Sequence, residues 1–192
     1  MSHFPVSDPT LFARLLQFDT DLAGESQALG CRHCGGVLHQ AHYPRKPRGV
    51  PSDQREAFSL RFSFCCADCR RRVTSPSLRF LGRKVYVGLV VVLASCCEGR
   101  IASWFAKVSA ATGVSLRTLY RWGSFWRDSV PATPFWREAA ARFVPPPEVA
   151  RFPAAALLER FGIQPPADQA LLAFLQFLSP LSVGPVIRFG EG

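Results

Sequence analysis

Apolar residues recur with two different periods along the chain, which predicts two kinds of element. Leu11, Leu15 and Phe18 repeat at helical spacing, so we expect one short helix within an N-terminal arm of residues 1–30. The acidic and polar run Asp19–Gly30 predicts a linker between this arm and the next segment.

In residues 31–75 apolar and polar side chains alternate. Phe58–Phe64 alternates strictly and is expected to be a half-buried β-strand. Its expected inner face holds Phe58, Leu60, Phe62 and Phe64, and its outer face holds Ser59, Arg61 and Ser63. Val37–Tyr43 is a second strand-like run. The basic stretch Pro44–Pro51, broken by proline and glycine, predicts the loop of a hairpin between the two strands.

Helical periodicity returns in residues 76–130, which are expected to form three helices. These run from about Leu78 or Arg83 to Ser95, over roughly Ile101–Ala111, and over roughly Leu116–Asp128. Ser115 is the expected N-cap of the third helix, because its hydroxyl can accept a bond from a backbone N–H without a helical partner. The longest apolar run, Val85–Cys97, has about 13 residues, fewer than the roughly 20 of a membrane span, so we expect a buried helix there.

Prolines bound the elements of the C-terminal segment, residues 131–192. They predict helical pieces at Pro134–Phe143, Pro153–Phe161 and Ala167–Leu178. The last piece is strongly apolar and must pack against another surface. This segment is therefore a candidate site for a protein partner or for a second copy of the chain.

Positive charge is concentrated in the middle of the chain. The 192 residues carry a formal net charge of +9, and the stretch from Cys31 to Arg127 holds 17 Lys and Arg against 4 Asp and Glu. Residues 131–192 hold equal numbers of each sign. A basic region beside a neutral tail favours a polyanionic partner, because cationic side chains release the counterions condensed on a nucleic acid.

Two CxxC turns give the clearest chemical signal. The chain has seven cysteines and no export signal is evident, so we expect a cytoplasmic protein whose cysteines bind metal. The sequence CRHCGG begins at Cys31 and CADCRR begins at Cys66. Zn²⁺ favours four thiolates in a tetrahedron, and each turn offers two. Residues 31–75 are therefore predicted to form a zinc ribbon, in which the Zn²⁺ ligands are Cys31, Cys34, Cys66 and Cys69.

Other side chains near these turns leave alternatives open. Cys65 could replace its neighbour Cys66, although Cys66 keeps the two-residue spacing to Cys69. Cys96–Cys97 ends the apolar helix and is expected in the core. Further possible ligands are His33, His39 and His42, of which the last two are expected on the hairpin surface.

The segment Phe105–Trp122 has the pattern of a helix-turn-helix. We therefore predict that residues 76–130 form a helix-turn-helix unit that binds DNA. Gly113 would end the first helix of the motif, and Ser109, four residues earlier, is small enough for the two helices to cross closely. The expected core residues are Val108, Val114, Leu119 and Trp122. Thr112 departs from the pattern, because its position is usually apolar. The fold class is thus predicted as α+β and mostly α, with a β zinc ribbon, a three-helix unit and a C-terminal helical segment.

Candidate DNA contacts follow from placing the second helix of the motif in a major groove. Arg117 and Arg121 lie four residues apart on one face, and an arginine can bind guanine through two hydrogen bonds. Neighbouring candidates are Ser115, Leu116, Thr118, Tyr120 and Ser124, with Lys107 and Arg127 as phosphate contacts. A basic rim of the ribbon is expected to contain Arg45, Lys46, Arg48, Arg61, Arg70, Arg71 and Arg72.

From Cys31 to about Trp126, half of the chain, the sequence resembles the N-terminal modules of bacterial transposases and related mobile-element proteins. The resemblance is carried by CxxCGG at Cys31, by CxxCRR at Cys66 and by the run Thr112–Trp122. It implies binding to element-end or operator DNA. It does not extend to catalysis, because residues 131–192 are too short for a nuclease domain with three metal-binding carboxylates.

The expected function is therefore a non-enzymatic, zinc-dependent and sequence-specific DNA-binding protein of the cytoplasm and nucleoid. A mobile-element accessory factor and a transcription regulator both fit this expectation. The alternative is a module for RNA binding or RNA–protein assembly, whose candidate stacking residues are Tyr43, Phe58, Phe62 and Phe64. A transposase truncated before its catalytic domain is a third interpretation.

Overall fold

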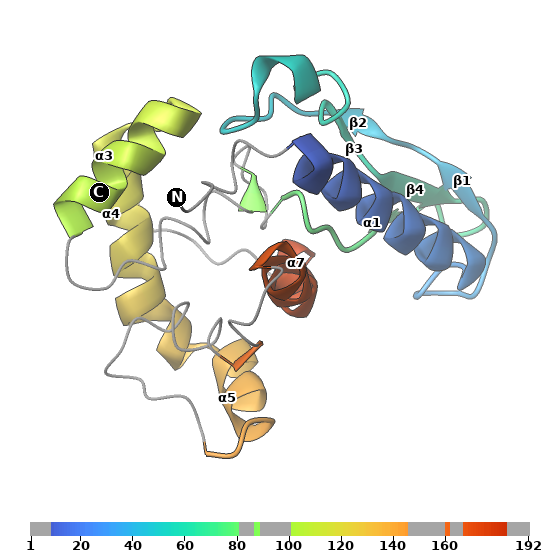
Figure 1. Cartoon of the computed structure of the whole chain (residues 1–192). Helices are drawn as coiled ribbons and strands as arrows, with labels where there is room; N and C mark the ends of the chain where they lie inside the picture. Colours follow the sequence, from blue (N-terminus) through green and yellow to red (C-terminus); the bar gives the residue numbers. More distant parts are fainter. Residues whose placement is uncertain (1–8, 81–86, 89–100, 146–159, 162–166, 184–192) are drawn as a thin grey trace.

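The computed structural model describes residues 9–80, 87–88, 101–145, 160–161 and 167–183, and these residues form an α+β fold (Figure 1). The helices are α1 (Pro9–Ala28), α3 (Ile101–Thr112), α4 (Leu116–Ser124), α5 (Pro134–Ala141) and α7 (Ala167–Leu178). The strands are β1 (Leu38–Gln40), β2 (Tyr43–Pro44), β3 (Leu60–Arg61), β4 (Ser63–Cys66) and β5 (Arg72–Thr74). Shorter helical turns are η2 (Ser52–Gln54), η3 (Phe125–Ser129, a π-helix), η4 (Val130–Ala132) and η5 (Ser179–Ser182).

The strands form two small antiparallel sheets. One sheet has the order β1-β4-β5, with Leu38 opposite Cys66 and Phe64 opposite Val73. The other pairs β2 with β3, so that Tyr43 lies opposite Arg61. The predicted hairpin therefore exists, but each of its arms is divided between the two sheets.

Most of the apolar side chains share one large core around α7, which lies between α1 on one side and α3 and α4 on the other (Figure 1). Leu171, Leu172, Phe174, Leu175 and Leu178 of α7 are all buried. The expectation that this strongly apolar helix packs against something is met within the chain itself. A partner or a second copy binding through residues 131–192 stays a prediction, and these buried side chains of α7 are not available to it.

A second, smaller core lies beneath the three-stranded sheet. It contains Cys31, Leu38, Phe64, Cys66 and Val73, together with Ala23 from the last turns of α1. The first half of α1 belongs instead to the large core. This helix therefore contributes side chains to both cores, which fixes the sheet relative to the helical part of the chain.

The predicted linker Asp19–Gly30 is wrong, because α1 continues through it to Ala28. Asp19 is fully buried and its carboxylate meets the Arg79 guanidinium at 2.7 Å. The acidic composition suggested a solvated connection, but the partner of Asp19 lies 60 residues later in the sequence. A sequence pattern confined to the arm gives no sign of that pairing.

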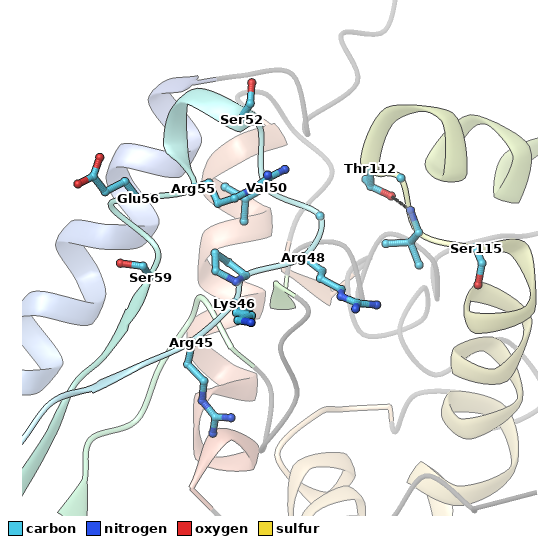
Figure 2. A pocket seen from close by; sticks show the side chains of 14 residues that line it. Arg45, Lys46, Arg48, Val50, Ser52, Arg55, Glu56, Ser59, Thr112 and Ser115 are labelled. Atoms are coloured by element: carbon cyan, nitrogen blue, oxygen red, sulfur yellow. Dashed lines mark hydrogen bonds between the residues drawn. The ribbon is translucent and has the colours of Figure 1, made fainter.

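The loop that follows β2 approaches the turn between α3 and α4. The backbone carbonyl of Arg48 accepts a hydrogen bond from the N–H of Val87, and the Val50 side chain enters the large core. Val114, which follows the α3–α4 turn, belongs to the same core. The basic loop and the turn consequently face each other across a cleft of about 920 Å³ (Figure 2).

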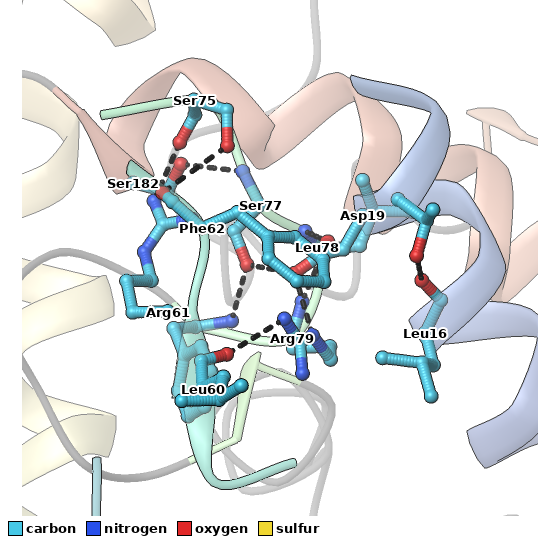
Figure 3. A network of polar contacts seen from close by, with 12 residues as sticks. Leu16, Asp19, Leu60, Arg61, Phe62, Ser75, Ser77, Leu78, Arg79 and Ser182 are labelled. Carbon is cyan, nitrogen blue, oxygen red and sulfur yellow. Dashed lines mark hydrogen bonds and ion pairs between the residues drawn. The ribbon is translucent and has the colours of Figure 1, made fainter. Parts of the chain in front are cut away.

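Asp19 and Arg79 form the centre of a buried polar network (Figure 3). Asp19 accepts hydrogen bonds from the Ser77 hydroxyl and from the backbone N–H of Leu78 at 2.6 Å. Arg79 donates to the carbonyls of Ala57 and Leu60 at 3.3 and 3.0 Å. These bonds join α1 to the segment after β5, and that segment to β3 and the loop before it.

The strict alternation predicted for Phe58–Phe64 is also wrong in its centre. Arg61 is only 2% exposed, whereas Leu60 is 45% exposed. Arg61 donates to the Ser75 carbonyl at 2.7 Å, and burial lowers the pKa of its guanidinium. The chain changes sheets between β3 and β4, so a single two-residue period does not continue across Phe62.

The helical expectations after residue 100 are largely confirmed. α3, α4, α5 and α7 begin within one or two residues of the predicted starts, and η3 continues the direction of α4. The expected helix ending at Ser95 and the piece Pro153–Phe161 lie mostly outside the described residues, although Leu78–Phe80 is not helical. None of the helices in the described ranges combines the length and apolar character needed to cross a membrane.

Candidate metal centre and nucleic-acid interface

Four cysteine sulfurs converge at the end of the three-stranded sheet where the central strand β4 finishes. The Sγ atoms of Cys31, Cys34, Cys66 and Cys69 all lie within 4.8 Å of one another. The Cys31–Cys69 and Cys34–Cys66 sulfur distances are 3.6 and 3.4 Å. Four sulfurs about 2.3 Å from a tetrahedral Zn²⁺ would be about 3.8 Å apart, so the cluster is compatible with a metal site of that geometry.

The β1–β4 pairing explains how cysteines 32 and 38 residues apart meet. Leu38 pairs with Cys66, and the Ala67 N–H donates to the Val37 carbonyl at 2.9 Å. This register places the chain just after the first CxxC turn beside the start of the second. The register of the sheet therefore places the two turns next to each other.

The two CxxC turns have the same backbone design. The N–H of Cys31 donates to the carbonyl of Gly36 at 2.9 Å, and the N–H of Cys66 donates to the carbonyl of Arg71 at 3.0 Å. Four residues after each first cysteine the backbone is left-handed, with φ of 76° at Gly35 and 58° at Arg70. The same turn thus occurs twice, once with the residue that favours this conformation and once without it.

Gly36 is required for a different reason, the close approach of the second turn. A Cβ atom at Gly36 would lie 2.0 Å from Asp68 Oδ2 and 3.1 Å from the Cys66 sulfur. A side chain there would displace Asp68 and press on a candidate ligand. The Gly-Gly pair after Cys34 therefore has two separate structural roles.

Cys65 does not belong to the four-sulfur cluster. Its thiol is directed towards backbone carbonyls, with Arg70 O at 3.6 Å and Cys66 O at 3.8 Å. Successive strand residues point to opposite faces, so Cys65 and Cys66 diverge in β4. The geometry selects Cys66, which is fully buried beside the other sulfurs.

The thiols of the cluster differ in acidity. Hydrogen bonding from the backbone at His33, helped by Cys34 and by the neighbouring sulfurs, lowers the pKa of Cys31 to about 7. The backbone at Arg71 acts in the same direction on Cys69, but burial and the three other sulfurs raise its pKa to about 12. A cation at the centre would favour all four thiolates, because a bound metal displaces the protons of its ligands.

The histidines near the cluster lie outside it. His42 is half-buried, accepts a hydrogen bond from the Ser63 N–H at 3.2 Å, and contacts the rings of Phe62 and Phe64 edge-on. His42, expected on the hairpin surface, is thus only partly exposed there. His33 and His39 are exposed, and His33 lies 3.4 Å from the Arg71 guanidinium.

The three arginines after Cys69 have different surroundings. All three are exposed, but the Arg72 guanidinium also donates to the Ala41 carbonyl at 2.6 Å and lies 5.4 Å from the centre of the Tyr43 ring. Arg72 thus connects β5 to the chain between β1 and β2. Arg61, predicted in the basic rim, is buried and does not contribute to that surface.

The α3–α4 turn has the contacts that its pattern predicts. Val108, Val114, Leu119 and Trp122 are buried in the large core, and Gly113 has a φ of 67°. The Ser115 hydroxyl accepts a hydrogen bond from the Thr118 N–H at 3.4 Å, which confirms Ser115 as the N-cap of α4. Thr112 occupies a position that is usually apolar. Its hydroxyl donates to the Val108 carbonyl at 2.7 Å and accepts from the Val114 N–H, so the polar group has partners within the turn.

α4 presents a basic, partly apolar face to solvent. Arg117 and Arg121 are exposed, and Leu116 and Tyr120 are 45% and 46% exposed. The Tyr120 ring also contacts Phe105 edge-on, at 4.8 Å between centres. Of the other candidates, Lys107, Ser115, Ser124 and Arg127 are exposed, Thr118 is half-buried, and Arg127 pairs with Asp128 at 2.9 Å.

The basic loop brings Arg45, Lys46 and Arg48 to the cleft opposite the α3–α4 turn, and the structure adds Arg55 to them. Sequence reasoning missed Arg55, which had only its charge to indicate a role. Cys96–Cys97, expected in the core, lies outside the described residues.

Comparisons with known proteins found no protein-family model, no curated protein and no solved structure that matches this chain.

The repeated turn leads to a stability prediction. Gly35→Ala is expected to reduce the free energy of unfolding by about 1 kcal/mol, because a side chain disfavours left-handed backbone even where, as here, nothing lies within 4 Å of the added Cβ. Arg70→Gly should leave stability unchanged or raise it slightly. Urea denaturation measures both. Equal destabilisation by the two substitutions would contradict the equivalence of the turns.

Proposed function

We propose that this chain is a non-enzymatic, zinc-dependent DNA-binding protein, in which a zinc ribbon and a helix-turn-helix contact one duplex. The observation that carries the proposal is the exposed pair Arg117 and Arg121 on α4, held behind a tight turn at Gly113. A capped helix that follows such a turn has the geometry of a groove-reading element. The proposal includes a mobile-element accessory role or transcription control in the nucleoid.

The four cysteines would hold Zn²⁺ through thiolates alone. A site of four sulfur ligands favours zinc over harder cations, and a closed tetrahedral site has a structural role. Bound zinc would fix the two CxxC turns relative to each other. Arg70, Arg71 and Arg72 would then keep a fixed position next to the sheet.

RNA recognition has less support from the aromatic side chains. Phe58 and Phe64 are buried, Phe62 is half-buried, and the Tyr43 ring lies 5.0 Å from the Arg45 guanidinium and 5.4 Å from that of Arg72. Single-stranded bases require exposed ring faces on which to stack. The residues expected to provide such faces are therefore used in packing.

Selection of sequences from a random duplex pool by the zinc-loaded chain tests the proposal. We expect one enriched motif, and we expect duplex DNA to displace a bound probe far better than structured RNA. An unenriched pool, or displacement by RNA as effective as by duplex, would contradict the proposal.

Arg121→Ala is expected to weaken binding to the selected motif by about 1–3 kcal/mol, because one base contact is lost. Binding to unrelated duplexes should change little. Arg137→Ala on α5 is a matched control with the same loss of one exposed cation. Fluorescence anisotropy with both kinds of duplex measures the difference. If Arg121→Ala weakened every sequence equally, the side chain would contact phosphate and not a base.

A further inference from the structure

The cleft between the basic loop and the α3–α4 turn is lined mainly by cationic and hydroxyl side chains. Arg45, Lys46, Arg48 and Arg55 contribute positive charge, and Glu56 is the acidic residue among the described lining. Ser52, Ser59, Thr112 and Ser115 add hydroxyl groups. Pro47, Val50 and Val114 add apolar surface, and none of the described lining residues is aromatic.

The two walls of the cleft belong to one packed unit. Val50 on the loop side and Val114 on the turn side both line the cleft and both belong to the large core. The loop is also held by the hydrogen bond from the Val87 N–H to the Arg48 carbonyl at 3.1 Å. The cleft is therefore part of the folded structure, because its walls are connected by buried contacts.

The cleft opens at the start of α4. Ser115, the N-cap of this helix, lines it, and the Arg48 side chain extends from the loop towards that side (Figure 2). The N-terminus of a helix favours anions, since its backbone N–H groups and dipole are positive at that end. The cations of the basic loop and the N-terminus of α4 therefore line opposite walls of the same cleft.

We infer that this cleft binds the sugar–phosphate backbone of the DNA whose major groove α4 enters, so that loop and helix contact one continuous stretch of duplex. The inference rests on the proposed DNA-binding function and adds the path of the strand. Charge complementarity identifies the occupant, because its partners here are cations, hydroxyls and a helix start. Among the described lining residues none is aromatic, so the contacts recognise backbone and not bases.

The double variant Lys46→Gln/Arg55→Gln tests the inference, since both side chains are exposed in the cleft. Each phosphate contact contributes about one to the slope of log affinity against log salt. We expect the slope to become shallower by about two. The loss of affinity between 50 and 200 mM salt should then be roughly ten-fold smaller. The selected motif should stay the same.

The matched control is Arg137→Gln/Arg142→Gln, which removes two exposed cations from the α5 end, far from the loop (Figure 1). Hydroxyl-radical footprinting should show protection extending without a gap from the α4 site to one flank, and the cleft variant alone should lose that flank. If the cleft variant matched the control in slope and footprint, the inference would be overturned while DNA binding stood. If no duplex were selected at all, the proposed function itself would fail.

Discussion

We expect the unmodified chain to bind one zinc ion per molecule. A chain carrying Cys66→Ser is expected to bind none. Serine removes one of four thiolates, and a structural zinc site contributes on the order of 10 kcal/mol or more to folding. Cys66 also lies in the small core beneath the sheet. We therefore expect loss of zinc and unfolding of β1, β4 and β5, measured by metal analysis and by amide hydrogen exchange.

The adjacent Cys65 supplies the control for this prediction. Cys65→Ser makes the same chemical change one residue earlier, where the thiol is directed towards the backbone carbonyls of Cys66 and Arg70. It should retain one zinc and the exchange protection of the sheet. A Cys66→Ser chain with full zinc content, or a Cys65→Ser chain without zinc, would show that the ligand assignment is wrong.

The second large effect is expected at the buried ion pair. Asp19→Ala leaves the Arg79 guanidinium in the core without its carboxylate, and breaking such a pair from one side costs about 3–5 kcal/mol. That is a large share of the 5–15 kcal/mol that stabilises an ordinary domain. The free energy of unfolding from urea denaturation measures the loss.

Two further variants separate the lost charge pair from simple loss of packing. Asp21→Ala, two residues along the same helix and exposed, should change stability by less than about 0.5 kcal/mol. Asp19→Ala combined with Arg79→Met should recover part of the loss, because no unpaired charge then remains buried. A double variant as unstable as the sum of its two single changes would contradict this explanation.

The pair α3 and α4 could be predicted from local signals. Gly113, the Ser115 cap and the spacing of Val108, Leu119 and Trp122 are all found within one short segment, although the buried side chains pack in the core shared with α1 and α7. Likewise, the CxxC spacing favoured the four sulfurs that meet, and the alternation of side chains in β4 decides between Cys65 and Cys66.

What could not be predicted depends on partners distant in sequence. The burial of Asp19 depends on Arg79, and the burial of Arg61 depends on the Ser75 carbonyl, so neither is visible in its own neighbourhood. The cleft is a further case: it joins Arg55 to Ser115 through a core that neither residue's sequence context reveals. Charge composition indicated a polyanionic partner without indicating where its strand would lie.

The most direct test is duplex affinity measured as zinc is removed and restored, with metal content determined on the same sample. Chelation should abolish tight binding to the selected duplex, and one equivalent of zinc should restore it, because in the proposed function the metal at the four cysteines fixes the positions of Arg70, Arg71 and Arg72. Unchanged affinity and unchanged salt dependence in a chain shown to be free of metal would contradict a zinc-dependent DNA-binding protein.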